Sequence, residues 1–451
     1  MLIIITVLLY FAALMLFSRV TARRGDNNQT FFRANRRSPW YMVAFGMVGA
    51  SISGITFVSV PGMTMFTGMT YVQMCIGFIL GYFAVAFVLL PVYYRLNLTT
   101  IYTYLKERLG LRSYKTGAWF FLISKMTGAA VRFYVVCIIL QRFVLDAIGV
   151  PFALTVVAMV ALIWLYTRRG GIKTLVWTDT FQTTCMFAAL ILIIYNVMGQ
   201  LGMSATDAVK AIAADEHSRM FVLDDWISTQ NFWKQLLSGA FVVIVMTGLD
   251  QDMMQKNLTC RTLREAQKDG IALPASGDEL LPMFAATGRL GSTVVVLFTI
   301  GIVAASFSSA DSALTALTTS YCVDIRQREG DEQLRRSAHI GIAVVFGLFI
   351  LMFKTLNSTS VIDAIYILCS YTYGPLLGLF AFGLFTNRKP CDKLVPYIAV
   401  ASPLVCFALE KTAMQCWGYK FGYELLMING LLTFVGLYVS GRDGERRASV
   451  V

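Results

Sequence analysis

The chain has 451 residues, of which 57% are hydrophobic and only 14% are charged, and its formal net charge at pH 7 is +12. A soluble domain rarely exceeds about half apolar residues, so this composition excludes an ordinary soluble enzyme or binding protein. The positive charge does not indicate nucleic acid, because the basic residues gather in short loops between apolar segments, as the positive-inside rule describes.

Apolar runs long enough to cross a bilayer recur along the whole chain. A helix crosses a hydrocarbon core of about 30 Å with roughly 20 residues. The sequence predicts spans at 2–18, 40–67, 72–95, 117–145, 149–166, 174–198, 235–255, 291–321, 338–355, 361–385, 395–409 and 423–440. We therefore expect an all-α polytopic protein, multi-pass in a plasma (inner) membrane, whose first helix is retained and whose basic loops are cytoplasmic.

The count of crossings fails at one place. The loops 256–268 and 326–336 are both basic and are predicted to be cytoplasmic, yet only the run 291–321 separates them. Two loops on one side need an even number of crossings. The segment 270–290 contains two prolines, Asp278 and Glu279, which are too costly to expose to lipid. The sequence predicts that a helix is absent at the 269/270 junction, unless one flanking loop lies on the unexpected side.

The second run contains a segment that favours a broken helix. GASISGITFVSVPG, residues 49–62, holds three glycines and Pro61 among four hydroxyl side chains. A break frees backbone carbonyls at membrane depth, which is tolerated where they line a cavity or bind an ion. The alternative is a kinked helix that packs through its small residues.

Charged side chains inside the predicted spans indicate a path for an ion or a substrate. They include Arg132, Asp179, Asp250 and Asp311. Arg132 either pairs with a carboxylate such as Asp250 or holds an anionic solute through its planar guanidinium. Asp179, near the start of its span, could alternatively cap a helix or bond to a neighbouring one.

The stretch AASFSSADS, residues 304–312, places hydroxyls on one face of the eighth span. Ala305, Ser308, Ser309 and Ser312 follow the spacing i, i+3, i+4 and i+7, which forms a single helical stripe. Neutral oxygen ligands suit a monovalent cation that has to be released again. Serines also serve close helix packing in membranes, and this alternative stays open.

Five motifs together resemble the sodium:solute symporter family, whose members couple sodium to sugars, proline, sialic acid, iodide or monocarboxylates. They are GGIKTLVWTDTFQ, DQDMMQK, GDELLP, AASFSSADSALTALTTS and YGPLLGLFAFGLF. The resemblance implies a LeuT-type five-plus-five inverted-repeat fold with one extra N-terminal helix and additional C-terminal helices, with about 12 spans where about 13 are expected.

The same resemblance divides the single transporter domain, 1–451, into parts. Its parts are the extra N-terminal helix and loop (1–39), the first repeat (40–198), the second repeat without a helix at 269/270 (233–386) and the C-terminal extra helices (387–451). The family pattern also has one more helix after DQDMMQK, which agrees with the failed count.

The resemblance implies three groups of site residues. The sodium site would use Gly49, Ile52, Ala305, Ser308 and Ser309. A second cation would use Asp179, Ser312 and Asp311, although Asp311 stands where such members often have serine. The solute would contact Ser51, Ser53, Thr56, Gln73, Arg132 and Asp250.

We therefore expect a sodium-coupled secondary active symporter, not an enzyme, that imports a small polar, carboxylated solute such as a sialic acid or a monocarboxylate. Its expected partners are sodium, the solute and the lipid bilayer, without nucleic acid; a monomer is compatible with the sequence. The alternatives are a sodium/sugar or polyol symporter, a proton-coupled carrier using Asp311 or Asp179, a membrane sensor, and a deletion variant that no longer transports. An intramembrane serine hydrolase is disfavoured, because both histidines lie outside the span centres.

Overall fold

The computed structural model describes residues 2–21, 28–51, 64, 66–141, 145–168, 171–269, 291–356, 361–419 and 421–441. For Ser51 and Ala305 it describes the backbone only. The described chain is helical throughout and contains no strand. The predicted all-α fold is confirmed, and each of the twelve predicted apolar runs overlaps a helix.

The helices that cover the predicted runs are α1 (Leu2–Thr21), α3 (Trp40–Ser51), α5 (Tyr71–Ala84) with η3 (Val85–Leu89) and α6 (Leu90–Arg95), α8 (Leu111–Leu140), α9 (Phe152–Thr167), α10 (Ile172–Leu201), α12 (Phe232–Val243) with η7 (Ile244–Gly248) and α13 (Gln251–Asn257), α16 (Gly291–Ser320), α17 (Glu332–Leu356), α18 (Val361–Phe385), α19 (Val395–Trp417) and α20 (Glu424–Ser440). Within the described residues, six helices are long and apolar enough to cross a membrane, or seven if the bent pair α12–α13 counts as one span.

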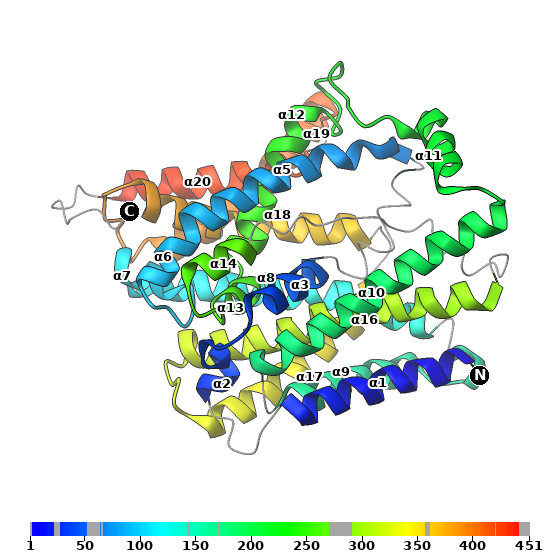
Figure 1. The fold of residues 1–451 in the computed structure, drawn as a ribbon. Helices are drawn as coiled ribbons and strands as arrows, with labels where there is room; N and C mark the ends of the chain where they lie inside the picture. The colour runs from blue at the N-terminus through cyan, green and yellow to red at the C-terminus, as the bar shows by residue number, and fades with distance from the viewer. Residues whose placement is uncertain are drawn as a thin grey trace.

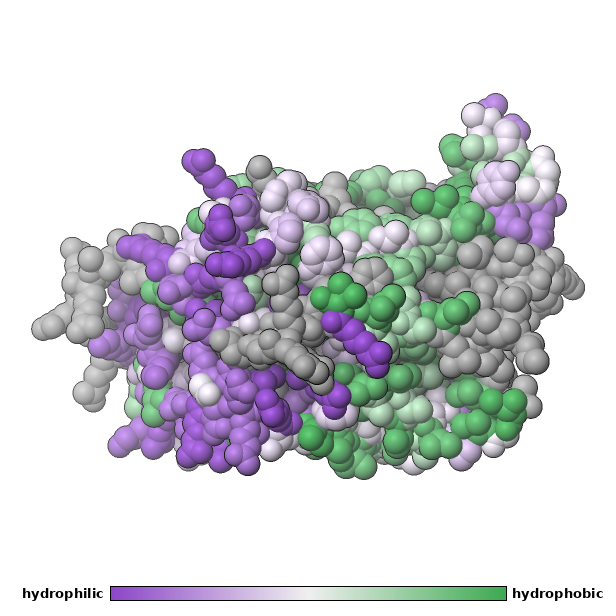
Figure 2. Space-filling view, turned by 60° about the horizontal axis from the view of Figure 1, so that its bottom comes forward, coloured by the Kyte–Doolittle hydropathy of each residue, from purple (hydrophilic) through white to green (hydrophobic). Residues whose placement is uncertain are grey.

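The short helices between them are α2 (Asn28–Arg33), η1 (Ala34–Arg36), η2 (Gly68–Thr70), α7 (Thr103–Arg108), η5 (Asp146–Ile148), α11 (Ala205–Ala214), η6 (Glu216–Ser218), α14 (Leu263–Asp269) and η8 (Tyr321–Ile325). Most of the long helices run in roughly the same direction across the molecule (Figure 1). We call the end at which α2, α7, α14 and η8 lie the basic end; α11 lies at the opposite end. Hydrophilic residues gather over the basic end, at the left of both views (Figure 2).

Glycines let the helices of the bundle approach one another closely. A Cβ added to Gly77 or Gly81 of α5, or to Gly239 of α12, would collide with the backbone of the other helix. Gly378 of α18 meets the backbone of α20 in the same way, and a Cβ added to Gly374 would collide with the side chain of Asn429 of α20. Small residues at four-residue spacing commonly form such contacts in membranes, where lipid offers no hydrophobic driving force between helices.

The seventh span is interrupted, which the sequence analysis did not predict. After the π-helical turn η7, the chain bends by 69° and continues as α13. Asp250 caps α13, because its side chain accepts the backbone N–H two residues later. The bend leaves two backbone carbonyls without helical partners, and buried tyrosines hydrogen-bond to them. Tyr93 donates to Gly248 O at 2.9 Å, and Tyr102 donates to Leu249 O at 3.0 Å.

The two loops at which the count of crossings failed both lie at the basic end. The N–H of Ser38 donates to Thr259 O in the first loop, and Tyr114 donates to Val323 O just before the second. Between them, α16 is the helix that the described residues provide, and residues 270–290 fall outside the described part of the chain. The predicted absence of a helix at this junction therefore stays a prediction. α16 itself ends at the basic end, where η8 continues it.

Candidate functional site

The first half of the predicted broken helix lies against both helices that carry proposed cation ligands. α3 packs on α10 and on α16. A Cβ added to Gly46 of α3 would lie 3.0 Å from Asp179 Cβ, and one added to Gly49 would collide with Thr183. The hydroxyl of Thr183 is buried and has no hydrogen-bond partner among the described residues. Buried polar atoms are normally paired, so this oxygen is free to bind a polar or charged group.

Asp179 lies at the centre of this region and is fully buried. One carboxylate oxygen, Oδ1, accepts a hydrogen bond of 2.7 Å from Ser308 Oγ of α16. The other, Oδ2, lies 2.8 Å from Lys256 Nζ of α13. The prediction that Lys256 begins a loop is wrong, because this residue lies in α13 and only 1% of it is exposed. The signal was present: Lys256 ends the motif DQDMMQK, next to a predicted span.

A second buried carboxylate, Asp311, lies on α16, the helix next to the one that carries Asp179. Its Oδ2 accepts a hydrogen bond of 2.6 Å from Tyr166 of α9, and its Oδ1 accepts one of 3.3 Å from Ser312. Asp311 also lies within electrostatic range of Asp179. The structure thus brings together the three residues that the sequence analysis named for a second cation, and adds Tyr166 and Lys256, which it missed.

The proposed sodium ligands are distributed over α3 and α16. Ser308 and Ser309 are buried, and Ala305 lies one turn earlier on the same helix. Gly49 lies near the end of α3. Ile52 lies outside the described residues. The contact between α3 and α16 is therefore present on the described backbone, while the ligand set itself stays a prediction.

A second lysine forms buried ion pairs close to the bend. Lys125 Nζ of α8 lies 3.2 Å from Asp250 Oδ2 and 2.6 Å from Asp252 Oδ2. Tyr373 of α18 donates to the same Asp250 oxygen at 2.6 Å. The alternative that Asp250 pairs with Arg132 is wrong, since Lys125 takes this place. The contribution of Asp250 to a solute site stays a prediction.

Arg132 lies seven residues after Lys125, which places both on one face of α8 about two turns apart. Its side chain is partly exposed, and none of the described residues forms an ion pair with it. It lies within electrostatic range of Cys369 of α18. This face of α8 therefore presents an uncommitted guanidinium towards α18.

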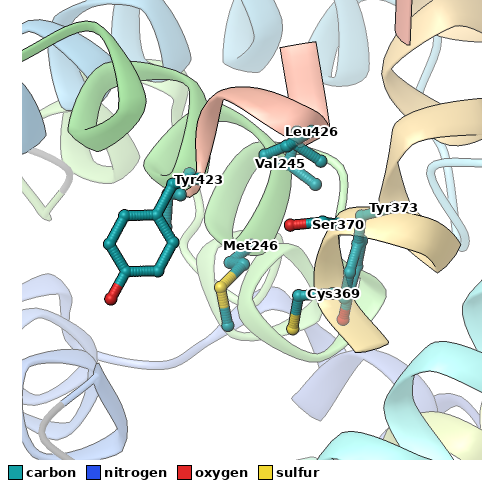
Figure 3. Close-up of a pocket in the computed structure, with 8 residues that line it drawn as sticks. Val245, Met246, Cys369, Ser370, Tyr373, Tyr423 and Leu426 are labelled. Carbon is teal, nitrogen blue, oxygen red and sulfur yellow. The ribbon is translucent and has the colours of Figure 1, made fainter. Parts of the chain in front are cut away.

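Cys369 lines a small pocket between α12, η7, α18 and α20. The pocket is lined by Val242, Val245, Met246, Cys369, Ser370, Tyr373, Tyr423 and Leu426. Figure 3 shows the sulfur-bearing side chains of Met246 and Cys369 lying between Tyr423 and Tyr373. Because Tyr373 also binds Asp250, the pocket adjoins the ion pair of Lys125.

Gln73, the expected solute contact on α5, is fully buried and bound to the loop before α12. Its Nε2 donates to Gln230 O at 2.9 Å, and its Oε1 accepts from the N–H of Val222 at 2.9 Å. These bonds hold the loop in place. Ser53 and Thr56 lie outside the described residues, as does the side chain of Ser51, so the solute contacts on the broken helix stay predictions.

Comparison with protein families and curated proteins gives consistent relatives. Residues 31–307, more than half of the chain, match the model of the sodium:solute symporter family. The chain is 25% identical to the sodium/sialic acid symporter NanT of Aliivibrio fischeri, covering 94% of this chain and 91% of the relative, and 23% identical to the sodium/sialic acid symporter SiaT of Proteus mirabilis, covering 94% and 93%. The alignment with NanT extends over 479 residues, more than the 451 of this chain, so the relative has residues without a counterpart here.

A solved structure has the same fold. A sodium-coupled sialic acid symporter in a substrate-bound outward-open state matches with a TM-score of 0.80 at 19% sequence identity, covering 98% of this chain and 99% of the other. At this identity the match supports the fold and does not by itself assign a solute.

Proposed function

Because the chain belongs to the sodium:solute symporter family, and is therefore a sodium-coupled transporter rather than an enzyme, we propose that it imports a small carboxylated solute. Among carboxylated solutes, sialic acids are the leading class. Two relatives that each match over 94% of the chain are named as sodium/sialic acid symporters, which supports this choice.

The observation that carries the proposal is the state of Arg132. A charged side chain in a membrane span is costly unless it is paired or functional. Lys125 on the same face of α8 has two carboxylate partners, whereas Arg132 has none among the described residues. A guanidinium binds a carboxylate through two parallel hydrogen bonds, so Arg132 is suited to hold the carboxylate of an incoming solute.

For sodium we propose the ligands Gly49, Ile52, Ala305, Ser308 and Ser309. This set supplies backbone and hydroxyl oxygens without a formal charge. The surroundings favour a cation, because buried carboxylates outnumber the lysines that pair with them. In the described part of α10, α13, α16 and the bend, the buried carboxylates are Asp179, Asp250, Asp252 and Asp311, and their lysine partners are Lys125 and Lys256.

Sodium would couple to the solute through the contact between α3 and α16. An ion that binds both helices favours the conformation in which they lie together, and its release on the other side of the membrane removes that preference. In transporters that contain discontinuous helices, the solute and ion sites lie close together near the membrane midplane. We therefore expect α3 and α16 to shape the solute site as well.

The solute is tested by uptake into proteoliposomes with an inward sodium gradient. We expect accumulation of a sialic acid, less of a monocarboxylate and none of a neutral hexose, and loss of accumulation when choline replaces sodium at constant pH. Arg132→Ala should abolish uptake, and Arg132→Lys should restore part of it. Accumulation of the hexose at the same rate, or full uptake by Arg132→Ala, would show that the carboxylate is not what the site selects.

The sodium ligands are tested by Ser308→Ala combined with Ser309→Ala. We expect this double variant to lose sodium-dependent uptake. Ser306→Ala on the same helix is the matched control, since Ser306 is buried but is not part of the proposed ligand set. If the double variant and the control have the same sodium dependence, the ligand assignment is wrong.

A further inference from the structure

The contact between Lys256 and Asp179 occupies the position at which the sequence analysis placed a second cation. The ammonium Nζ lies 2.8 Å from Asp179 Oδ2, and the other oxygen of the same carboxylate accepts from Ser308, one of the proposed sodium ligands. Exposed fractions of Asp179 and Lys256 are 0% and 1%. A lysine ammonium has the charge of a sodium ion and, like it, binds oxygen.

Asp179 has one cation within reach among the described residues. Lys125, the other buried lysine, is bound to Asp250 and Asp252. The carboxylates that face Lys256 are Asp179, in contact, with Asp252 and Asp311 at longer range. Of these, Asp252 has Lys125, and Asp311 accepts hydrogen bonds from Tyr166 and Ser312. Lys256 is therefore committed to Asp179.

We propose that the ammonium of Lys256 fills the cation position of Asp179, so that this carboxylate is neutralised by the protein's own side chain instead of a second sodium ion. The consequence is a transporter that moves one sodium ion with each solute molecule. This inference rests on the proposed function for its stoichiometry, but the binding of sodium at Asp179 can be measured without any solute.

The wild-type stoichiometry is tested in proteoliposomes held at zero membrane potential, by finding the solute gradient that just balances a sodium gradient. With one sodium per solute, an about tenfold sodium gradient balances an about tenfold solute gradient, because the free energies of both gradients are logarithmic. With two sodium ions it balances about 100-fold. A gradient near 100-fold in the wild-type protein overturns the inference, whereas complete absence of uptake contradicts the proposed function and leaves the binding test below intact.

The occupancy of Asp179 is tested by the sodium dependence of thermal stability in purified protein without solute. In Lys256→Gln the carboxylate has lost its cation, and we expect sodium to replace it. The slope coefficient of the unfolding free energy against RT ln[Na+] at saturating sodium, which counts the sodium ions bound by the folded protein, should then rise from about one to about two. Lys256→Arg keeps the charge and should behave as wild type. Lys256→Gln combined with Asp179→Asn removes both charges and should return the coefficient to about one. Lys210→Gln, on the exposed helix α11, controls for the loss of a positive charge.

The stoichiometry measurement and the stability measurement test the inference independently. If Lys256→Gln is folded and its sodium dependence equals that of wild type, the ammonium does not stand in for sodium and the inference is wrong. If Lys256→Gln cannot be purified as a folded protein, the wild-type gradient and the double variant still decide between one cation and two.

Discussion

The short helix α13 has a buried lysine–carboxylate contact at each of its ends, and the carboxylates of Asp250 and Asp179 differ in how completely their oxygens are bound. At the start of α13, Asp250 Oδ1 accepts the N–H of Asp252, while Asp250 Oδ2 accepts from Lys125 and Tyr373. At its last turn, Lys256 Nζ and Asp179 Oδ2 meet at 2.8 Å, and neither atom has a hydrogen bond of good geometry to any other described group.

The difference assigns the two contacts different tasks. Buried ion pairs contribute little net stability, because desolvation offsets their attraction, but removing one partner is costly. Around Asp250 the partners come from α8, α13 and α18, so this network fixes the bend and the helices beside it. Around Asp179 the atoms keep capacity to bind, and the neighbour is Ser308, on the proposed sodium helix. We therefore propose that the first contact stabilises the helix scaffold and that the second belongs to the transport site.

The largest effect is expected from Lys125→Met, which breaks the scaffold contact. It leaves Asp250 and Asp252 buried without a cation, and such a loss costs about 3–5 kcal/mol. Thermal unfolding of the purified protein should show this destabilisation at every sodium concentration. Lys210→Met, at an exposed position, should change stability little. A stability of Lys125→Met equal to that of the control would mean that the bend does not depend on this network.

The helices of this protein could be predicted from the sequence, but the burial and the ion pairs of two of its lysines could not. Twelve apolar runs predict the spans, because hydrocarbon admits few alternatives to a continuous apolar helix. Lys125 was overlooked inside the run 117–145, and Lys256 was assigned to a loop, since basic residues at span ends usually are in loops. Their carboxylate partners lie on other helices, up to 127 positions away along the chain. Such pairings arise from tertiary packing, which periodicity does not encode.

In the candidate site too, the spacing of residues along a helix could be predicted from the sequence, whereas contacts between helices could not. The spacing of Ser308, Ser309 and Ser312 on one helix follows from sequence alone, and so does the cost of Asp179 and Asp311 inside spans. That Ser308 donates to Asp179, and that Tyr166 donates to Asp311, depends on how α9, α10 and α16 pack. The bend after η7 was also missed, although Gly248 followed by a capping aspartate is a signal that could have revealed it.

Asp324 extends the comparison to a buried carboxylate without a lysine. It lies in η8, after the end of the predicted span 291–321. Thr100, Tyr114 and Ser320 donate to it, the last two at 3.0 and 2.6 Å. Burial raises the pKa of Asp324 to about 7, although these three hydrogen bonds act in the opposite direction.

A raised carboxyl pKa makes the folded state bind more protons than the unfolded state between about pH 4 and pH 7. Stability from this group is therefore present below the unfolded pKa and is lost as pH rises through the folded pKa. We expect the stability of wild type to fall relative to Asp324→Asn from pH 5 to pH 7, by at most about 1.4 kcal/mol per pH unit, and to level off above pH 7. Melting temperatures of both proteins at each pH measure this. A constant difference between them would show that Asp324 does not titrate in this range.

The smallest effect is expected from Tyr373→Phe, which removes one bond from the scaffold contact and keeps its lysine. A hydrogen bond to a charged group contributes about 1.5–3 kcal/mol, and we expect the lower end of this range because Lys125 remains on the same oxygen. Melting without solute isolates this effect, since Tyr373 also lines the small pocket. Tyr195→Phe, at an exposed position of α10, is the matched control. If both variants melt alike, Asp250 does not depend on its full set of partners, and the contrast between the two ends of α13 is lost.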